Sequence, residues 1–117
     1  MHQFKELTMW KKSSLFCSSI YSVTSSFPSD EKFGLTNQLR RASVSIPSNI
    51  AEGSSRNSNK EFGRFLEIAI GSAYEIETQI LIAFDLGFLP NEKLKGLLLQ
   101  LEEIIKMTSK FKSSLKI

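Results

Sequence analysis

The chain has 117 residues, a mass of 13.2 kDa and a formal charge of +3, with 41% hydrophobic and 23% charged residues. This composition is too apolar for a disordered chain, and the length accommodates one hydrophobic core and not two. We therefore expect a single globular domain over residues 1–117, whose function the net charge alone does not indicate.

Several chemistries lack the residues they require. Cys17 is the one cysteine and His2 the one histidine, so internal disulfides, Cys/His metal sites and histidine catalysis are not expected. The sequence has no phosphate-binding glycine loop and no Ser/His/Asp set, so we expect no catalytic residue, no metal and no cofactor. No signal peptide and no run long enough to span a membrane is visible, which favours the reducing cytoplasm and no membrane partner.

The first predicted helix covers residues 4–26. Trp10, Cys17 and Tyr21 share one stripe of such a helix, although its many serines are weak helix formers. Pro28 follows this segment, and proline disfavours a helical residue before it. We expect the Cys17 side chain to be an unreactive thiol in the core.

The second predicted helix covers residues 30–53, with Ser29 or Asp30 capping its start. Its apolar residues recur every three or four positions, as on one face of a helix. Pro47 lies inside this pattern. Because proline has no N–H, it leaves the Ser43 carbonyl without its helical partner and is expected to kink the helix.

The last two predicted helices cover residues 58–87 and 90–114. Gly53 is interpreted as the stop of the preceding helix, and Ser58 with Glu61 has the spacing of a capping box. Both segments repeat apolar residues with alternating steps of three and four, which is typical of helices packed almost parallel to their neighbours. The four segments predict an all-α fold, an antiparallel up-down-up-down four-helix bundle.

A resemblance to a known family is carried by residues 35–58, LTNQLRRASVSIPSNIAEGSSRNS, and residues 71–80, GSAYEIETQI. They resemble the 23S rRNA-intervening-sequence proteins, and the likeness extends over nearly the whole chain. The resemblance implies a small bacterial cytoplasmic four-helix bundle related to the accessory proteins of diversity-generating retroelements, which form pentameric barrels and bind nucleic acid. By this resemblance we expect a homo-oligomer, with a pentamer as the implied form. The family has no defined biochemical role, so the fold follows more directly than the function.

Charged residues beside the apolar faces of the second and third predicted helices predict an ion-pair network. In an antiparallel hairpin of these helices, facing positions sum to about 112. That register places Arg41 between Glu67 and Glu75, and it places Glu52 beside Arg64. We interpret these as pairs that fix the register of the helices. An acid/base or di-iron site at Glu67 and Glu75 is the alternative, but the di-iron bundle needs histidines that are absent.

Gly71 and the aromatic residues could have structural or ligand-binding roles. Gly71 is interpreted as a point of close helix packing, with a ligand contact as the alternative. Trp10, Tyr21 and Tyr74 could stack on nucleic-acid bases, but aromatic residues at helical spacing in a bundle favour the core. We therefore expect all four to stabilise the fold.

The predicted topology gathers positive charge at the end of the bundle where the first helix starts and the last one stops. This basic end has ten cations against three acids, a net charge of +7: Lys5, Lys11, Lys12, Arg56, Lys60, Arg64, Lys106, Lys110, Lys112 and Lys116 against Glu6, Glu52 and Glu61. The opposite end has three cations and six acids, a net charge of −3. A basic surface of this kind attracts phosphate backbones without reading sequence.

Two functions fit this charge distribution. The first is non-specific binding of RNA or DNA through seven basic residues: Lys11, Lys12, Arg56, Lys60, Lys106, Lys110 and Lys112. The lysines between residues 106 and 116 could instead only complement the dipole at the end of the last helix. The alternative function is that of a protein-interaction scaffold or accessory subunit, which contacts a protein partner without binding nucleic acid directly.

Overall fold

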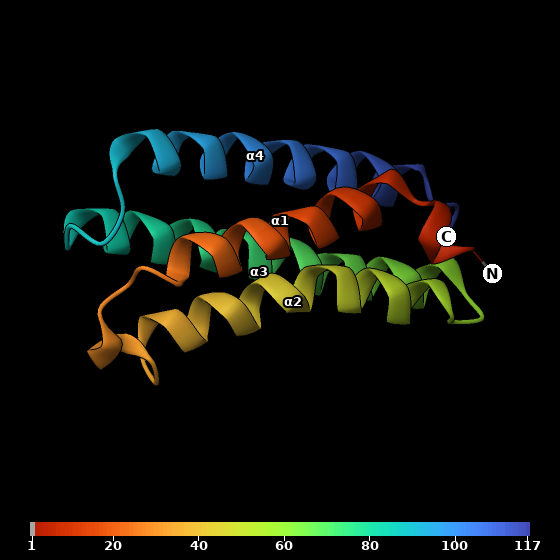
Figure 1. The fold of residues 1–117 in the computed structure, drawn as a ribbon. Helices are drawn as coiled ribbons and strands as arrows, with labels where there is room; N and C mark the ends of the chain where they lie inside the picture. The colour runs from red at the N-terminus through yellow and green to blue at the C-terminus, as the bar shows by residue number, and fades with distance from the viewer. Residues whose placement is uncertain (1) are drawn as a thin grey trace.

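The computed structural model describes residues 2–117 and consists of helices. In chain order these are η1 (Phe4–Glu6), α1 (Thr8–Thr24), η2 (Ser29–Glu31), α2 (Leu35–Ser54), α3 (Asn59–Asp85) and α4 (Asn91–Ser114), where η marks a 3-10 helix. Residues 2–117 contain no strand, so the all-α prediction is confirmed. Figure 1 shows the four long helices side by side, with each helix running opposite to the one before it. No helix in this range is long and apolar enough to cross a membrane.

The two chain ends and the α2–α3 connection lie at the same end of the bundle (Figure 1). The backbone N–H of His2 donates to the carbonyl of Ser54 at 3.4 Å. The Asn59 side-chain amide donates to the carbonyl of Lys116 at 3.0 Å. The convergence of three chain segments that the topology predicts is therefore present.

The core follows the predicted apolar stripes. The side chains that are almost completely buried come from all four long helices and include Phe16, Ile20, Leu39, Ile46, Ile50, Leu66, Ile76, Ile80 and Leu101. Trp10 packs against the core half-buried, with its ring 5.1 Å from that of Phe4. Tyr21 and Tyr74 are 45% and 55% exposed, so the prediction that they lie in the core is wrong.

The starts of the first two long helices differ from the prediction. Residues 4–6 form the separate helix η1, and α1 begins only at Thr8. The second long helix begins at Leu35 and not at residue 30, because Gly34 has a non-helical backbone with φ −110° and ψ −117°. The carboxylate of Glu31 accepts the Leu35 N–H at 2.9 Å, so it caps this helix in place of the predicted serine or aspartate.

The ends of α3 follow capping chemistry. Ser58 accepts the N–H of Glu61 at 3.2 Å, as the capping-box spacing predicts. At the other end Gly87 has a φ of +80°, and the N–H of Phe88 donates to the carbonyl of Ala83 at 2.9 Å. This left-handed glycine with its backward hydrogen bond is a Schellman motif, which ends α3 two residues earlier than predicted.

Gly53, and not Gly71, is the glycine at a close contact between helices. Gly53 lies inside α2 and does not stop it, and a Cβ added there would be 2.6 Å from the Cβ of Phe65 on α3. Gly71 is exposed, and an added Cβ would have no atom within 4 Å. Gly53 is therefore the position that allows α2 and α3 to approach closely, and the prediction for Gly71 is wrong.

The carbonyl that Pro47 leaves without a helical partner is satisfied by another helix. The assigned helix α2 continues through Pro47 without a break. The Sγ of Cys17 on α1 donates to the carbonyl oxygen of Ser43 at 3.0 Å. The thiol is half-buried, and desolvation raises its pKa above the ordinary 9.0, while its hydrogen bonds act in the opposite direction. Cys17 therefore has a structural role as a hydrogen-bond donor.

The raised pKa of Cys17 predicts a specific loss of stability at high pH. Below pH 9.0 the thiol is protonated in the folded and unfolded chains, and its contribution is complete. Above that value the unfolded chain loses its proton first, so the free energy of unfolding falls until the folded thiol also ionises. Urea unfolding between about pH 8 and pH 11 measures this decrease. We expect the free energy of unfolding of Cys17→Ser to decrease less over this pH range, because serine does not ionise there. The same pH dependence in Cys17→Ser and in the original chain would contradict the prediction.

Candidate nucleic-acid interface

The basic end is less positive in the structure than in the sequence-based count. Three acids that the sequence-based count places at neither end of the bundle pair with lysines of the basic end: Glu103 with Lys12, Glu102 with Lys106 at 2.8 Å, and Glu67 with Lys112 at 3.3 Å. With these acids included, the basic end has ten cations against six acids, a net charge of +4. The charged residues that then belong to neither end are Arg40 and Arg41, with a net charge of +2.

Four of the seven predicted phosphate contacts are in ion pairs. Three of them are Lys12, Lys106 and Lys112, which pair with Glu103, Glu102 and Glu67. The fourth is Arg56, which pairs with Glu52 at 2.9 Å. The Arg56 guanidinium also lies over the ring of Phe65, 4.8 Å from its centroid. Exposed ion pairs contribute only about 0–1 kcal/mol, so a phosphate can replace the carboxylate at small cost.

The other three predicted contacts are exposed cations. Lys11, Lys60 and Lys110 make no ion pair with any residue between 2 and 117. They lie on α1, α3 and α4 respectively, so each converging segment of the basic end contributes one. These three lysines are the parts of the predicted site that a phosphate backbone can contact without breaking an existing pair.

The predicted ion-pair network is wrong. Arg41 and Arg64 are exposed, and neither pairs with an acid in the described part of the chain. Glu52 pairs instead with Arg56, one turn along the chain, and Glu67 with Lys112 of α4. Glu75 accepts a hydrogen bond from Gln79 at 3.2 Å.

The register of α2 against α3 explains why these pairs do not form. Ser45 lies 2.9 Å from Ser72, and Gln79 donates to Gln38 at 3.3 Å. The residue numbers of both pairs add up to 117, whereas the predicted register had a sum of about 112. Side-chain contacts between packed helices recur about once per helical turn. A different length or path of the α2–α3 connection therefore shifts the residues of α3 that face a given residue of α2 by a turn or more. The polar contacts between α2 and α3 are therefore between neutral groups.

The carboxylates of Glu67 and Glu75 do not form a common site. Glu67 faces α4, where it meets Lys112, while Glu75 is linked through Gln79 to α2. Within residues 2–117 no three His, Cys, Asp or Glu side chains lie close enough together to hold a metal ion. The geometry thus offers no paired-carboxylate chemistry at these positions.

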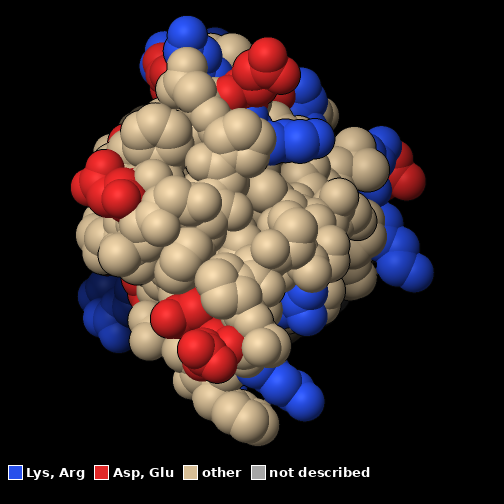
Figure 2. Space-filling view, turned by 60° about the vertical axis from the view of Figure 1, so that its left-hand side comes forward, with Lys and Arg blue, Asp and Glu red and all other residues tan. Residues whose placement is uncertain are grey.

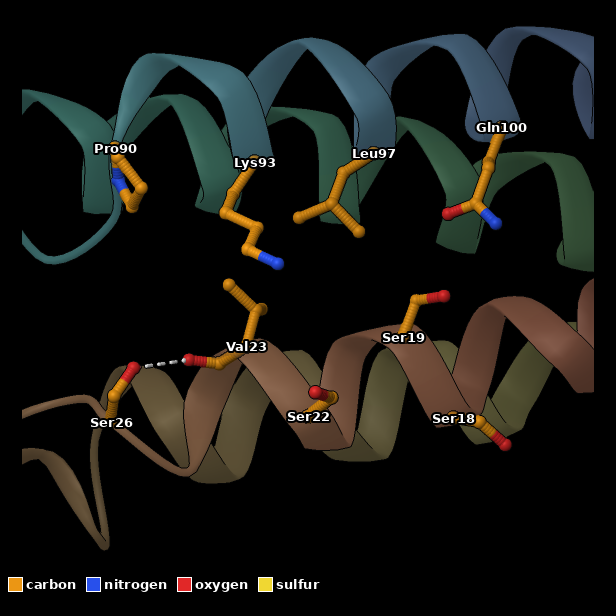
Figure 3. A pocket seen from close by; sticks show the side chains of 9 residues that line it. All are labelled: Ser18, Ser19, Ser22, Val23, Ser26, Pro90, Lys93, Leu97 and Gln100. Atoms are coloured by element: carbon orange, nitrogen blue, oxygen red, sulfur yellow. Dashed lines mark hydrogen bonds between the residues drawn. The ribbon is translucent and has the colours of Figure 1, made fainter.

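A polar groove that the sequence did not suggest lies between α1 and α4 (Figure 3). Its volume is about 510 Å³, and it is lined by Ser18, Ser19, Ser22, Val23, Ser26, Pro90, Lys93, Leu97 and Gln100. Lys93 and Gln100 extend from α4 toward the serines of α1 in Figure 3. The small serine side chains leave this space unfilled, and the lining has hydrogen-bonding groups but no acid, histidine or thiol.

The opposite end of the bundle has no comparable cluster of cations on the side that Figure 2 shows. This view turns the left-hand end of Figure 1 toward the reader, and charged groups of both signs lie mostly around the edge of a largely uncharged surface, with acidic and basic groups adjoining near the top.

Arg40 is a basic residue that the site prediction missed. Its Nε donates to the Thr24 hydroxyl at 2.9 Å and its Nη2 to the Tyr21 carbonyl at 3.4 Å. The guanidinium carbon lies 4.6 Å from the centroid of the Tyr21 ring. No acid in the described range pairs with it. These contacts join residues of α1 and α2 that are 16 and 19 positions apart in the sequence. The spacing of residues within one helix could not reveal such a pairing.

Comparisons with known proteins support the fold and a family. A family model for the 23S rRNA-intervening sequence protein matches residues 5–110. Among solved structures, the chain is similar to a protein of unknown function from the S23 ribosomal protein family of Bacteroides thetaiotaomicron. The TM-score is 0.82 at 23% identity, and the match covers 92% of this chain and 100% of the other. No curated protein gives a significant match.

Proposed function

The chain belongs to the family of 23S rRNA-intervening sequence proteins, and from this premise we propose that it is a non-catalytic bundle that binds RNA or DNA through its basic end. The observation that carries the proposal is the convergence of three chain segments at one end of the molecule, each with an exposed lysine that has no ion-pair partner among residues 2–117. A net charge of +4 at that end favours phosphate backbones of any sequence, and such binding weakens steeply with salt.

The proposal predicts that three lysines account for much of the affinity. We expect the triple variant Lys11→Gln, Lys60→Gln and Lys110→Gln to bind a fluorescent RNA at least tenfold more weakly at low salt. The slope of log affinity against log salt should decrease by about two to three, because each lost phosphate contact removes up to about 0.9. Fluorescence anisotropy at several salt concentrations measures both quantities.

A matched control separates local contacts from net charge. The variant with Lys32, Lys93 and Lys95 each changed to Gln removes the same charge from the opposite end of the bundle. We expect it to retain nearly the original affinity. Equal losses in both triple variants, or no binding of RNA or DNA by the original chain at low salt, would contradict the proposal.

We further propose that the chain self-associates, with a pentamer as the form implied by the family resemblance. Large exposed hydrophobic side chains support this: Ile68, Tyr74, Leu81 and Ile82 on α3, Leu86 directly after it, and Leu99 on α4. Assembly would place several basic ends on one particle and raise affinity through multivalency. Light scattering coupled to size-exclusion chromatography tests self-association. A measured mass of 13.2 kDa, that of one chain, at micromolar concentration would contradict it.

The same exposed side chains favour a second candidate function, that of a protein-interaction scaffold. A groove of about 410 Å³ between α3 and α4 is lined by Tyr74, Glu77, Leu98, Leu101, Glu102, Ile105 and Lys106. Apolar grooves between helices accept amphipathic helices of partner proteins. This candidate gains support if the oligomer forms but neither RNA nor DNA binds at low salt.

A further inference from the structure

We propose that Arg40, held on the ring of Tyr21, is a preorganised phosphate-binding residue on the side of the bundle, away from the basic end. The inference rests on the proposed function, because it takes the same class of ligand, a nucleic-acid phosphate backbone. It extends the contact surface from the end of the bundle along the junction between α1 and α2.

The contacts of the guanidinium fix its position without neutralising its charge. A ring face, a hydroxyl and a backbone carbonyl hold Arg40, through Tyr21 and Thr24. All three partners are neutral, whereas Arg56, the other arginine stacked on an aromatic ring, pairs with Glu52. Arginine has five N–H donors, and the bonds to Thr24 and Tyr21 use two of them. Free donors therefore remain for a phosphate oxygen.

Holding the side chain in advance lowers the cost of binding. A long, free arginine loses rotamer freedom when it contacts a phosphate, and a guanidinium already restrained by stacking loses less. Arg40 is half-buried, so its charge is also less screened by water than that of an exposed lysine. Both effects favour Arg40 over the exposed lysines as a single phosphate contact.

The two helices that carry Arg40 and its partners contain few acids, and the nearest acids before α2 are Asp30 and Glu31 of η2. Helix α1 contains no Asp or Glu, and Glu52 is the single acid of α2, where it is paired with Arg56. By contrast, α3 contains five acids against two cations. A phosphate backbone along α1 and α2 therefore meets less repulsion than one along α3.

Arg40 has a structural role that must be separated from ligand binding. Its bond to the Tyr21 carbonyl lies near the C-terminal end of α1, where a cation complements the helix dipole. If this were its whole function, its removal would lower the melting temperature and leave RNA affinity unchanged. If it binds phosphate, affinity falls in the chain that remains folded.

The test compares two neighbouring arginines in the full chain. Arg40→Gln and Arg41→Gln remove the same charge from adjacent positions of α2, but Arg41 is exposed and has no ion pair with residues 2–117. With a short fluorescent RNA, we expect about a tenfold loss of affinity for Arg40→Gln and less than about threefold for Arg41→Gln. The salt slope of Arg40→Gln should also decrease by about 0.7 to 0.9.

Two further variants keep the test decisive if Arg40→Gln lowers stability. Arg40→Lys retains the charge but loses the planar fork, and Tyr21→Leu removes the stacking ring without changing any charge. We expect both to lose affinity severalfold while the salt slope stays the same. Equal losses for Arg40→Gln and Arg41→Gln, or full RNA affinity in every Arg40 and Tyr21 variant, would overturn the inference.

The two proposals can fail separately. If the triple variant of Lys11, Lys60 and Lys110 loses binding while Arg40→Gln retains it, the basic end is the site and this inference is wrong. If Arg40→Gln loses binding while the triple variant retains it, the inference stands and the basic end is not the site.

Discussion

Replacing Gly53 with alanine is expected to destabilise the bundle by about 2 kcal/mol. The new methyl group would lie 2.6 Å from the Cβ of Phe65 and 2.9 Å from the Cδ1 of Phe62. A Cβ atom cannot swing away as the end of a flexible side chain can, so α2 and α3 must move apart. Overpacking costs about 1–3 kcal/mol or more, and the helix propensity of alanine returns about 1 kcal/mol. Thermal unfolding should show a melting temperature lowered by roughly 5–10 °C.

Gly71→Ala is the matched control for this prediction. The substitution is the same and the helix is again continuous, but no atom lies within 4 Å of the added Cβ. We expect it to stabilise the chain by about 0.5–1 kcal/mol, which is the difference in helix propensity. A loss of stability for Gly53→Ala together with a gain for Gly71→Ala would support the close approach of the helices at Gly53. A destabilisation of similar size at Gly71 would mean that helix packing there is also tight.

The fold could be predicted from the sequence because its determinants are local. Alternating steps of three and four place Leu66, Ala69 and Ile76 on one stripe, and all three are buried. The helix termini were less predictable, since the cap of α2 is the carboxylate of Glu31 four residues before the helix starts. Capping rules identify the residue types that accept N–H groups, but the backbone of Gly34 decides which of them is in reach.

The candidate site was harder to predict because it depends on the register between helices. The sequence identifies which residues are charged, and the topology identifies the end at which they lie. The pairing of Glu67 with Lys112, and not with Arg41, depends on the rotation of α3 relative to α4 and α2. A displacement of about one turn changes every partner while leaving the apolar stripes unchanged. Arg40 was missed for the same reason, because its neighbours come from another helix.

Cys17 and Pro47 are expected to be energetically coupled through the Ser43 carbonyl. In the original chain, Cys17→Ala leaves the Ser43 carbonyl without a donor, and Ser43 is completely buried. An unsatisfied buried carbonyl costs about 1–3 kcal/mol, so we expect a loss of about 2 kcal/mol in the free energy of unfolding. Pro47→Ala restores an N–H to the same carbonyl and removes an interior proline, so we expect it to stabilise the helix by about 1–2 kcal/mol.

The double variant distinguishes a hydrogen bond from simple packing. If the thiol acts as the donor that replaces the missing N–H, Cys17→Ala should cost only about 1 kcal/mol in the Pro47→Ala background. If the thiol only fills space, the two changes should add, because the volume that is lost does not depend on residue 47. Urea unfolding of the four chains gives the coupling energy directly. A coupling of about 1 kcal/mol would show that α1 completes the hydrogen bonding of α2, so that the serine-rich first helix is required for the proline-containing motif beside it.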